Sequence, residues 1–473
     1  MLLLERTDSD GKKDMAKFLP AQLLKGGKGK KGSFDDSSSG RVDQATAAYI
    51  MREFGGVNID GSSSRAGSTS EESREEGSDF GLLEDSSTYV LPEFKQLSRD
   101  NQRRACDMLS IDSIKSWDFN IFELKDLVGK RPLLFMGWAV LGSPHSQRVM
   151  AKLCKRPEPG EDTGYNFIDS ELQIPMSTLC DYLRVINDDY QDNPYHNSTH
   201  AADVLQSLHS MLQMESALNP TKLELFSILL AAAVHDVDHP GLNNAFQANA
   251  KTDLALIYND KSVLENKHAA HAFLKMMGDE GTKQSAKLLG KGRINHGREA
   301  ELNVLCNAPS KDIPTIRSHV IDAIMHTDMS DHFALVNHIK GLILEDNNGL
   351  AAISEDERWK ILTFMMHMAD ISGQAKPDPL FLRWCERVTE EFFLQGDKEA
   401  ELGLPVSNLC DRRTTHVNES QIGFIEFVVK PSFAVLGEIL PEVKHVVVPI
   451  VQSNKEYYVK QKEINNPKKE GAP

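Results

Sequence analysis

The 473-residue sequence lacks the features that mark several large classes of protein. Its six cysteines are scattered and form no CxxC pair, which argues against a disulfide framework and predicts reduced thiols in a reducing, cytoplasmic compartment. No uninterrupted apolar run reaches the roughly 18 residues of a membrane span, and the opening MLLLERTD is too short for a signal peptide. We therefore expect no stable insertion into a membrane.

An excess of positive charge is also missing. The formal net charge is −16, because 53 Lys and Arg stand against 69 Asp and Glu. A chain with this balance has no overall positive field to attract phosphate backbones, so we expect no nucleic-acid partner. What remains is an ordinary soluble composition, 40% hydrophobic and 26% charged, on a chain long enough to bury a large core.

Apolar residues are sparse between about residues 25 and 87, where Gly, Ser and charged residues dominate. Such a segment cannot bury enough surface to offset its conformational entropy, so residues 1–88 are predicted to form a disordered polar N-terminal region. Within it, Arg65 stands three residues before Ser68, a spacing suited to a basophilic kinase. Matches of this kind arise by chance in Ser-rich tails, and an unmodified linker is the alternative.

Strand-type alternation is absent after residue 88. Apolar residues instead recur at three- and four-residue spacing, broken by Pro, Gly and Asn clusters. This pattern predicts one all-α domain over residues 89–456, followed by a polar C-terminal tail over residues 457–473. The polar, Gly-punctuated stretch 278–301 is typical of a long surface loop, and the sequence leaves a homodimer open.

The most informative stretch is AAAVHDVDHPGLNNAF, residues 231–246. The preceding residues 222–234 are apolar on almost every side, which predicts a buried helix. His235 and Asp236 follow at its end, before Pro240 stops the helix. A buried ionised carboxylate is costly unless it is paired or bound to a metal, so Asp236 requires a partner.

Two other apolar helices carry the same kind of anomaly. His200 continues the apolar line of Val204 and Leu208, and Asp370 lies among Met, Leu, Ile and Phe in residues 361–372. Alone, each is more often a hydrogen-bonded core residue than a ligand. Together two imidazoles and two carboxylates suit zinc or a similar divalent ion, and the set is His200, His235, Asp236 and Asp370. A carboxylate at Asp236 can bridge two ions, as in two-metal sites that act on phosphoesters.

A series of blocks in the sequence resembles, in order, the signature blocks of the class I cyclic nucleotide phosphodiesterase catalytic domain, and most closely its cAMP-hydrolysing branch. The blocks are YHNSTHAADV, HDVDHPG, LIYNDKSVLENKHA, HTDMSDHF, HMADIS, EEFFLQGDKEAELG and ESQIGFIEFVVKP. The resemblance runs from about Trp117 to about Pro441. It implies a compact multi-helix domain of the HD type that hydrolyses 3′,5′-cyclic nucleotides to 5′-nucleoside monophosphates and so ends cyclic nucleotide signals.

The resemblance also implies roles for individual residues. Zinc would be held by His200, His235, Asp236 and Asp370, and Asp236 would bridge to a second ion, magnesium or manganese. His196 would act as the general acid that protonates the leaving ribose oxygen, and Glu265 would orient it. His239 and Thr327 would hydrogen-bond water on the metals.

The implied substrate-binding residues are Tyr195, Asp370, Val388, Phe392, Gln421 and Phe424. The carboxamide of Gln421 would pair with the purine edge, while Phe424 and Val388 would enclose the base. As bare sequence, a Gln near a Phe is more often core or surface. One position departs from the family: Gly373 in DISGQAKPD stands where adenine-hydrolysing members commonly carry Asn. We expect cAMP to be the better substrate, with weakened selectivity against cGMP.

Two alternative functions remain at this point. Another HD-type nucleotide phosphohydrolase would share the His-Asp metal ligands but not ESQIGFIEFVVKP or EEFFLQGDKE. A catalytically weak cyclic-nucleotide-binding module would be expected to have lost a metal ligand or His196, and the sequence retains all of them.

Overall fold

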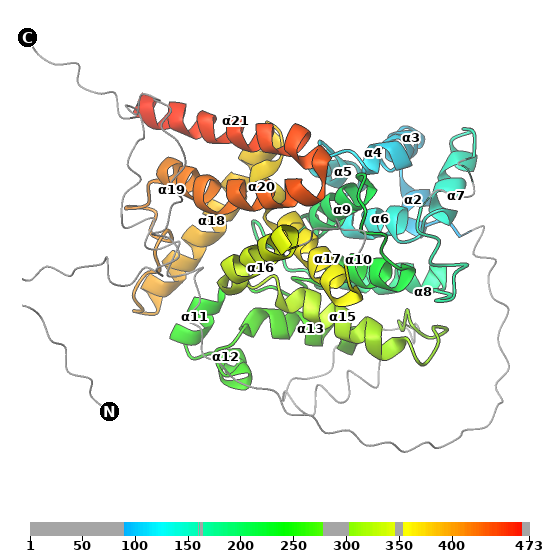
Figure 1. Ribbon diagram of the computed structural model, residues 1–473, viewed down its shortest axis with the longest axis horizontal. Helices are drawn as coiled ribbons and strands as arrows, with labels where there is room; N and C mark the ends of the chain where they lie inside the picture. The colour runs from blue at the N-terminus through cyan, green and yellow to red at the C-terminus, as the bar shows by residue number, and fades with distance from the viewer. Residues whose placement is uncertain (1–88, 159, 161–163, 278–301, 346–352, 466–473) are drawn as a thin grey trace, which may run out of the picture. The chain divides into compact units, whose positions relative to one another are not determined.

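The computed structural model describes residues 89–158, 160, 164–277, 302–345 and 353–465 (Figure 1). These residues form helices and connecting segments without any strand, which confirms the all-α prediction for this part of the chain. None of the helices described is both long enough and apolar enough to cross a lipid bilayer. The predictions for the tail 1–88, for a kinase site at Ser68 and for the loop 278–301 lie outside the described residues.

The first half of the domain contains α2 (Pro92–Gln96), α3 (Arg99–Met108), α4 (Ile111–Ile114), α5 (Ile121–Val128), α6 (Pro132–Val140), α7 (His145–Leu153), α8 (Met176–Asp189), α9 (Ser198–Gln213), α10 (Lys222–Val234), α11 (Asn244–Asn249), α12 (Asp253–Tyr258) and α13 (Val263–Met276). The second half contains α15 (Ile313–Met325), α16 (His332–Glu345), α17 (Glu355–Asp370), α18 (Leu380–Glu401), α19 (Val417–Phe424), α20 (Lys430–Ile439) and α21 (Pro441–Asn465). Short 3-10 turns occupy η3 (Met329–Asp331) and η5 (Ile371–Ala375), and a π-helical segment, η6 (Ile425–Val429), joins α19 to α20.

Helices α9, α10 and α17 pack against one another at the centre of the core. As predicted, α10 is buried on almost every side from Phe226 to Val234. A capping box starts α10 at Thr221 and another starts α17 at Ser354, which satisfies the first backbone N–H groups of both helices. Arg358 connects the first turns of α10 and α17, because its Nε donates to both carboxylate oxygens of Glu224 at 3.0 Å.

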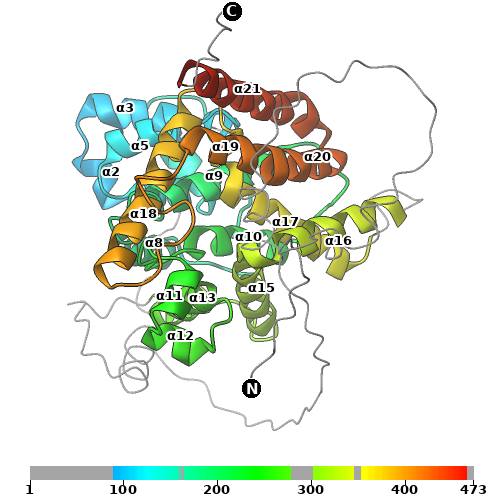
Figure 2. The same ribbon diagram turned by 90° about the vertical axis from the view of Figure 1, so that its left-hand side faces the viewer.

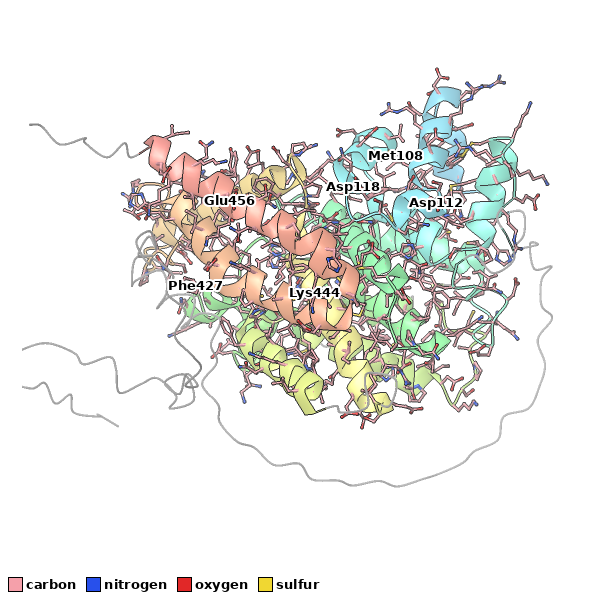
Figure 3. All side chains as sticks on the ribbon, turned by 45° about the horizontal axis from the view of Figure 1, so that its top comes forward. Met108, Asp112, Asp118, Phe427, Lys444 and Glu456 are labelled. Atoms are coloured by element: carbon pink, nitrogen blue, oxygen red, sulfur yellow. A yellow bond between two sulfur atoms is a disulfide. The ribbon has the colours of Figure 1, made fainter. Side chains whose placement is uncertain are left out.

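Helices α20 and α21 lie side by side in Figures 1 and 2 and pack closely. Helix α21 buries Val447, Val451 and Tyr458 along one face, whereas Lys444 and Glu456, labelled in Figure 3, are exposed. The helix continues to Asn465, so the predicted domain end at residue 456 is wrong. The error arose because the exposed charges of the last turns conceal a buried face that repeats every three or four residues.

The prediction of reduced thiols is wrong for one pair of cysteines. Cys106 on α3 and Cys154, directly after α7, form a disulfide. They are 48 residues apart in the sequence. Spacing of this length carries no signal, because only the packing of the two helices brings the sulfurs together.

Candidate active site

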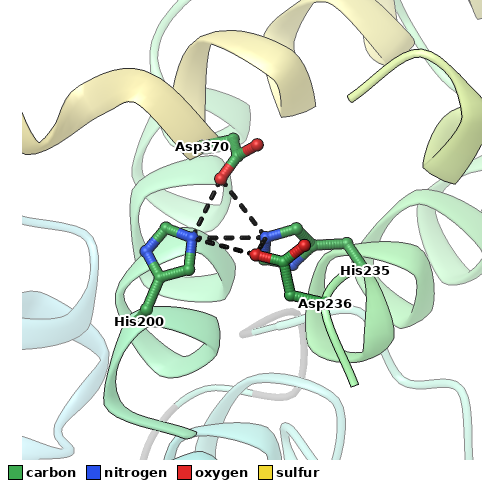
Figure 4. A group of neighbouring side chains, drawn as sticks. All are labelled: His200, His235, Asp236 and Asp370. Atoms are coloured by element: carbon green, nitrogen blue, oxygen red, sulfur yellow. Dashed lines mark hydrogen bonds and ion pairs between the residues drawn. The ribbon is translucent and has the colours of Figure 1, made fainter. Parts of the chain in front are cut away.

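Three core helices bring four metal-ligating side chains to one point (Figure 4). His200 lies in the first turn of α9, and this turn is fixed by the Asn197 side chain, which accepts from the backbone N of Thr199 at 2.8 Å. His235 and Asp236 follow the C-terminal end of α10, and Asp370 is the last residue of α17. The sequence prediction that these four residues converge is therefore confirmed as geometry.

The distances within this cluster suit a small divalent cation. The Nε2 atoms of His200 and His235 are 3.3 Å apart. Asp370 Oδ1 lies 2.9 Å and 3.2 Å from them, and Asp236 Oδ2 lies 3.5 Å and 3.1 Å from them. A tetrahedral ion with bonds of about 2.0–2.1 Å separates its ligand atoms by about 3.3 Å. The side chains present therefore fit a four-ligand metal site.

Electrostatics in the cluster favour the ligand form of the two carboxyl groups and the protonated form of His235. Burial opposes ionisation of Asp236 and Asp370, yet the facing imidazoles hold the pKa of both carboxyl groups below their usual range. Burial likewise opposes a charge on His235, but the two carboxylates raise its pKa well above the ordinary value. His235 Nδ1 donates to the carbonyl of Ala232 at 3.0 Å, so its Nε2 is the atom that faces the cluster. A bound divalent cation would displace the proton from this nitrogen.

A second group of metal-ligating residues lies beside the first: His196, His239 and Glu391. Two adjacent clusters of this kind are consistent with a binuclear metal centre. In the second cluster, however, His196 Nδ1 donates a hydrogen bond to Glu391 Oε1. Glu391 Oε2 accepts from the backbone N of Tyr195 at 2.8 Å and of His196 at 3.0 Å. Glu391 thus fixes both the ring and the backbone of His196.

The pairing of His196 with Glu391 shifts the pKa of both groups. Burial alone would lower the pKa of His196, but the charge and hydrogen bond of Glu391 outweigh it and raise the pKa to about 9. Burial works against ionisation of Glu391, and His196 nevertheless holds its pKa below the ordinary value. The imidazole therefore retains its proton near neutral pH in the protein alone.

The expectation that Glu265 orients His196 is wrong. Glu265 lies on α13, where its two oxygens accept from Asn244 Nδ2 at 3.2 Å and 2.9 Å. Burial and the nearby charge of Asp328 raise the pKa of Glu265 to about 8. Glu391 carried a detectable signal, because it shares a buried stripe of α18 with Trp384 and falls in the block EEFFLQG. A carboxylate on a buried stripe needs a partner, as was argued for Asp370.

His239 lies in a column of three imidazole rings. Its ring stacks on that of His196 with centroids 4.0 Å apart, and His268 stacks on its other side at 5.5 Å. His239 Nδ1 accepts from the backbone N of Gly241 at 3.0 Å. His268 was not predicted as a site residue, yet its Nε2 lies 3.7 Å from Asp236 Oδ1. Burial lowers the pKa of His268 to about 4, so it is neutral in this column.

A cavity of about 290 Å³ opens beside the metal cluster. Part of its lining is polar, which we call the metal end, and includes His196, Asp236, His239, Glu265, Thr327 and Asp370. Another part is mainly apolar, which we call the apolar end, and includes Trp384, Val388 and Phe392 of α18 and Phe424 of α19. The α18 residues are spaced four apart and therefore share one face of the helix. The ring of Trp384 lies 5.8 Å from that of His200, and the ring of Tyr195 lies 4.6 Å from His200 and 5.4 Å from Trp384, so the two parts of the lining adjoin here.

Two of the predicted site residues are placed differently from the others. Gln421 lies on α19 one turn before Phe424 but is not among the residues that line the cavity. It is buried, and its Oε1 has no hydrogen-bond partner among the described residues. Thr327 lines the cavity, but its hydroxyl donates to the carbonyl of Ile324 at 2.7 Å.

Gly373 lines the cavity and packs closely against Trp384. A Cβ at this position would lie 3.1 Å from Trp384 Cβ and 3.2 Å from Trp384 Cγ. The glycine therefore does more than leave out a polar side chain, because any larger residue would press on the indole that forms the cavity wall.

Comparison with known proteins gives a consistent result. Residues 195–450 match the family model described as 3′5′-cyclic nucleotide phosphodiesterase. The chain is 37% identical over 339 residues to the dual specificity calcium/calmodulin-dependent 3′,5′-cyclic nucleotide phosphodiesterase 1C of Mus musculus, which covers 70% of this chain and 41% of the relative. It is 33% identical over 356 residues to a 3′,5′-cyclic-AMP phosphodiesterase, isoform F, of Drosophila melanogaster, covering 74% of this chain and 47% of the relative. This chain thus matches less than half the length of each of these relatives.

Among solved structures, the phosphodiesterase domain of the Salpingoeca rosetta rhodopsin phosphodiesterase is similar in fold. The TM-score is 0.59 at 26% sequence identity, and the match covers 76% of this chain and 95% of that domain. The similarity therefore extends over nearly the whole of that domain.

Proposed function

Because the chain belongs to the 3′,5′-cyclic nucleotide phosphodiesterase family, we propose that it hydrolyses 3′,5′-cyclic nucleotides to 5′-nucleoside monophosphates and so ends cyclic nucleotide signals. One observation carries the proposal. Asp236 and Asp370 of the four-ligand cluster line the same cavity as His196, which is paired with Glu391, so a metal site and a proton donor can act on one bound phosphodiester.

We assign zinc to the four-ligand cluster, because two imidazole nitrogens and two carboxylates at these distances suit it. Asp236 points Oδ2 into this cluster and Oδ1 toward His268, so its second oxygen is free to share in holding another ion. Magnesium or manganese suits that position, which offers few protein ligands. When bound, the zinc and the second ion would supply a nucleophile from water near neutral pH and would neutralise charge on the phosphodiester.

His196 holds the proton that the leaving ribose 3′ oxygen requires. Its Nδ1 is fixed by Glu391, so Nε2 is the nitrogen that can donate within the cavity. Nε2 lies 3.9 Å from Asp236 Oδ2, and this short distance to the metal cluster supports the assignment of His196 as the proton donor. Transfer of a proton to the leaving group avoids the release of an alkoxide.

We assign the purine to the apolar end of the cavity, called the base end below, between Val388 and Phe424. We assign the purine edge to Gln421, which lies one turn before Phe424 on α19 and whose side chain would have to turn toward the cavity. The unpartnered Oε1 of Gln421 accepts from the exocyclic amine of adenine, or from N1–H of guanine if the carboxamide turns. Gly373 offers no side chain that would favour one base. We therefore propose that cAMP is preferred, as the sequence blocks indicate, and that cGMP is also hydrolysed.

The proposal is tested by assaying the purified full chain on cAMP and cGMP, with analysis of bound metal and identification of the product. We expect bound zinc and release of 5′-nucleotides from both substrates, faster from cAMP. Binding of cyclic nucleotide without turnover would indicate a regulatory module instead. Turnover of other nucleotide phosphates, but not of the cyclic diesters, would indicate a different HD-type phosphohydrolase.

The partners and the compartment stay predictions from the sequence. A kinase acting at Ser68 concerns residues outside the described part, and the homodimer is a prediction of the same kind. The predicted cytoplasmic location assumed reduced thiols, whereas Cys106 and Cys154 are paired.

A further inference from the structure

The segment directly after the metal ligand Asp370 forms part of the cavity wall. Ile371, Gly373 and Gln374, all in η5, line the cavity. The segment is buried from Ser372 to Lys376. A short 3-10 turn leaves backbone carbonyls without helical partners, and buried carbonyls need donors from elsewhere.

Two side chains from opposite ends of the domain supply those donors. Trp117 Nε1 donates to the carbonyl of Ala375 at 2.9 Å. Asn454 Nδ2 donates to the carbonyl of Gln374 at 2.9 Å and to that of Lys376 at 2.8 Å. One indole and one carboxamide thus hold three consecutive carbonyls, that of Gln374 in the cavity wall and those of the two residues that follow it.

The side chain of Lys376 ties the same segment to α9. It is fully buried, with Nζ 3.2 Å from Gln206 Oε1 and 3.6 Å from Asp203 Oδ1. The ammonium also lies 4.7 Å from the centre of the Trp117 ring. Because α9 also carries His200, these contacts connect the segment after Asp370 to the helix that holds a metal ligand.

The position of Asn454 is difficult to explain by stability alone. It is 3% exposed and lies on the buried face of α21 with Val447, Val451 and Tyr458. A carboxamide among apolar side chains is costly unless it is hydrogen-bonded, and an apolar residue would fill the same place. Both Asn454 and Trp117 also lie outside residues 195–450, which match the family model.

We propose that Trp117 and Asn454 are positioning residues for nucleotide binding: they hold residues 374–376 so that the base end of the cavity keeps its shape. The inference rests on the proposed function and adds residues outside the matched region to it. Gln374 is the residue of this segment that both lines the cavity and is bonded to Asn454. Its Oε1 is buried and has no hydrogen-bond partner among the described residues, so the placement of Gln374 depends on the backbone that Asn454 holds.

The test compares substrates with and without a base. Asn454→Asp keeps the size of the side chain but sets a carboxylate oxygen against two carbonyls. Trp117→Phe keeps an aromatic ring and removes only the N–H donor. For both variants kcat and KM are measured on cAMP, on cGMP and on bis(p-nitrophenyl) phosphate, a phosphodiester without a purine, together with metal content and melting temperature.

We expect KM for the cyclic nucleotides to rise roughly 5- to 30-fold in Asn454→Asp, with a smaller rise in Trp117→Phe. Turnover of bis(p-nitrophenyl) phosphate and the metal content should change less than about 2-fold, because the metal cluster does not contact these side chains. Asn187→Asp is the matched control. Asn187 is also 3% exposed and bonded to backbone groups, at Lys130 and Leu133, but it does not line this cavity. It should lower the melting temperature without changing KM.

An equal loss on all three substrates in the folded variants would overturn the inference, and so would unchanged KM values in both. If Asn454→Asp does not fold, Trp117→Phe alone decides between these outcomes. A wild-type chain that binds cyclic nucleotides without turnover would refute the proposed function only. The same comparison would then be made with dissociation constants for cAMP, which should weaken in the variants but not in Asn187→Asp.

Discussion

The two ends of the cavity are built on different principles. At the metal end, His200, His235, Asp236 and Asp370 lie within 3.5 Å of at least one other member of the cluster. Near the base end, the carboxamide oxygens of Gln374, which lines the cavity, and of Gln421, which does not, are buried without a hydrogen-bond partner among the described residues. The metal end is thus organised by contacts within the protein, while two buried acceptors near the base end have no such contacts. Changes at the first end should affect chemistry and folding, and changes at the second should affect binding.

The largest effect is expected from removing a metal ligand. His235→Ala should lose the tightly bound ion and lower kcat by about 10³-fold or more, because the ion contributes several kcal/mol to catalysis. It should also destabilise the fold by roughly 3 to 5 kcal/mol, since the remaining carboxylates are left buried and uncompensated. Metal analysis, turnover and denaturant unfolding measure the three quantities. The exposed His445→Ala serves as control. Full activity in a metal-free His235→Ala protein would remove the metal assignment.

A smaller loss, confined to chemistry, is expected at the proton donor. His196→Asn should lower kcat by roughly 10²- to 10⁴-fold while the metal stays bound. Glu391→Gln should lower kcat by about 10- to 100-fold, because it keeps the size of the side chain but loses the charge that orients His196. Glu390→Gln is the matched control, since Glu390 is the neighbouring carboxylate and pairs with Arg412 outside the cavity. Equal activity of the two glutamine variants would show that Glu391 has no role in catalysis.

At the base end we expect an effect on binding. Gln421→Ala should lower kcat/KM for cAMP by roughly 10- to 100-fold, mainly through KM, because a polar contact to the purine is lost. Turnover of bis(p-nitrophenyl) phosphate should stay within about 2-fold, since that diester has no base. Gln452→Ala, on α21 and bonded to Glu456, is the control. A parallel loss on both substrates would show that the two ends of the cavity are not separable.

The smallest effect concerns the choice of base. Gly373→Asn should raise the ratio of kcat/KM for cAMP over cGMP by roughly 5-fold relative to Gly373→Ala. The two variants share the Cβ that presses on Trp384, so their difference isolates the added carboxamide. Both should bind nucleotide more weakly than wild type because of this crowding. Identical ratios in the two variants would mean that position 373 does not discriminate between the bases.

The difference between the metal end and the base end also explains which parts of the site could be predicted from the sequence. His200, His235, Asp236 and Asp370 were accessible from the residues alone, because ionisable groups on apolar helices must meet partners. Gln421 and Phe424 gave no such signal, since both residue types are common in cores. Only the resemblance to a family suggested them.

The errors have the same physical origin. Glu391 was missed in favour of Glu265, although both are carboxylates on helices, because the partner of His196 depends on how α18 packs against the start of α9. The all-α class followed from local spacing and was confirmed. The end of the domain and the Cys106–Cys154 bond were predicted wrongly because both depend on contacts between distant segments.

The directions in which α9, α10 and α17 approach the metal cluster also affect the electrostatic field there, because each helix has a dipole. Helices α10 and α17 both end at the metal ligands, so the negative ends of two helix dipoles point at the site. Each favours a cation by about 0.3–1 kcal/mol and disfavours the carboxylates beside it. Helix α9 instead begins there, so its positive end opposes part of this effect. The ends of α10 and α17 thus add to the demand for a divalent cation between Asp236 and Asp370, independently of the side chains that hold it.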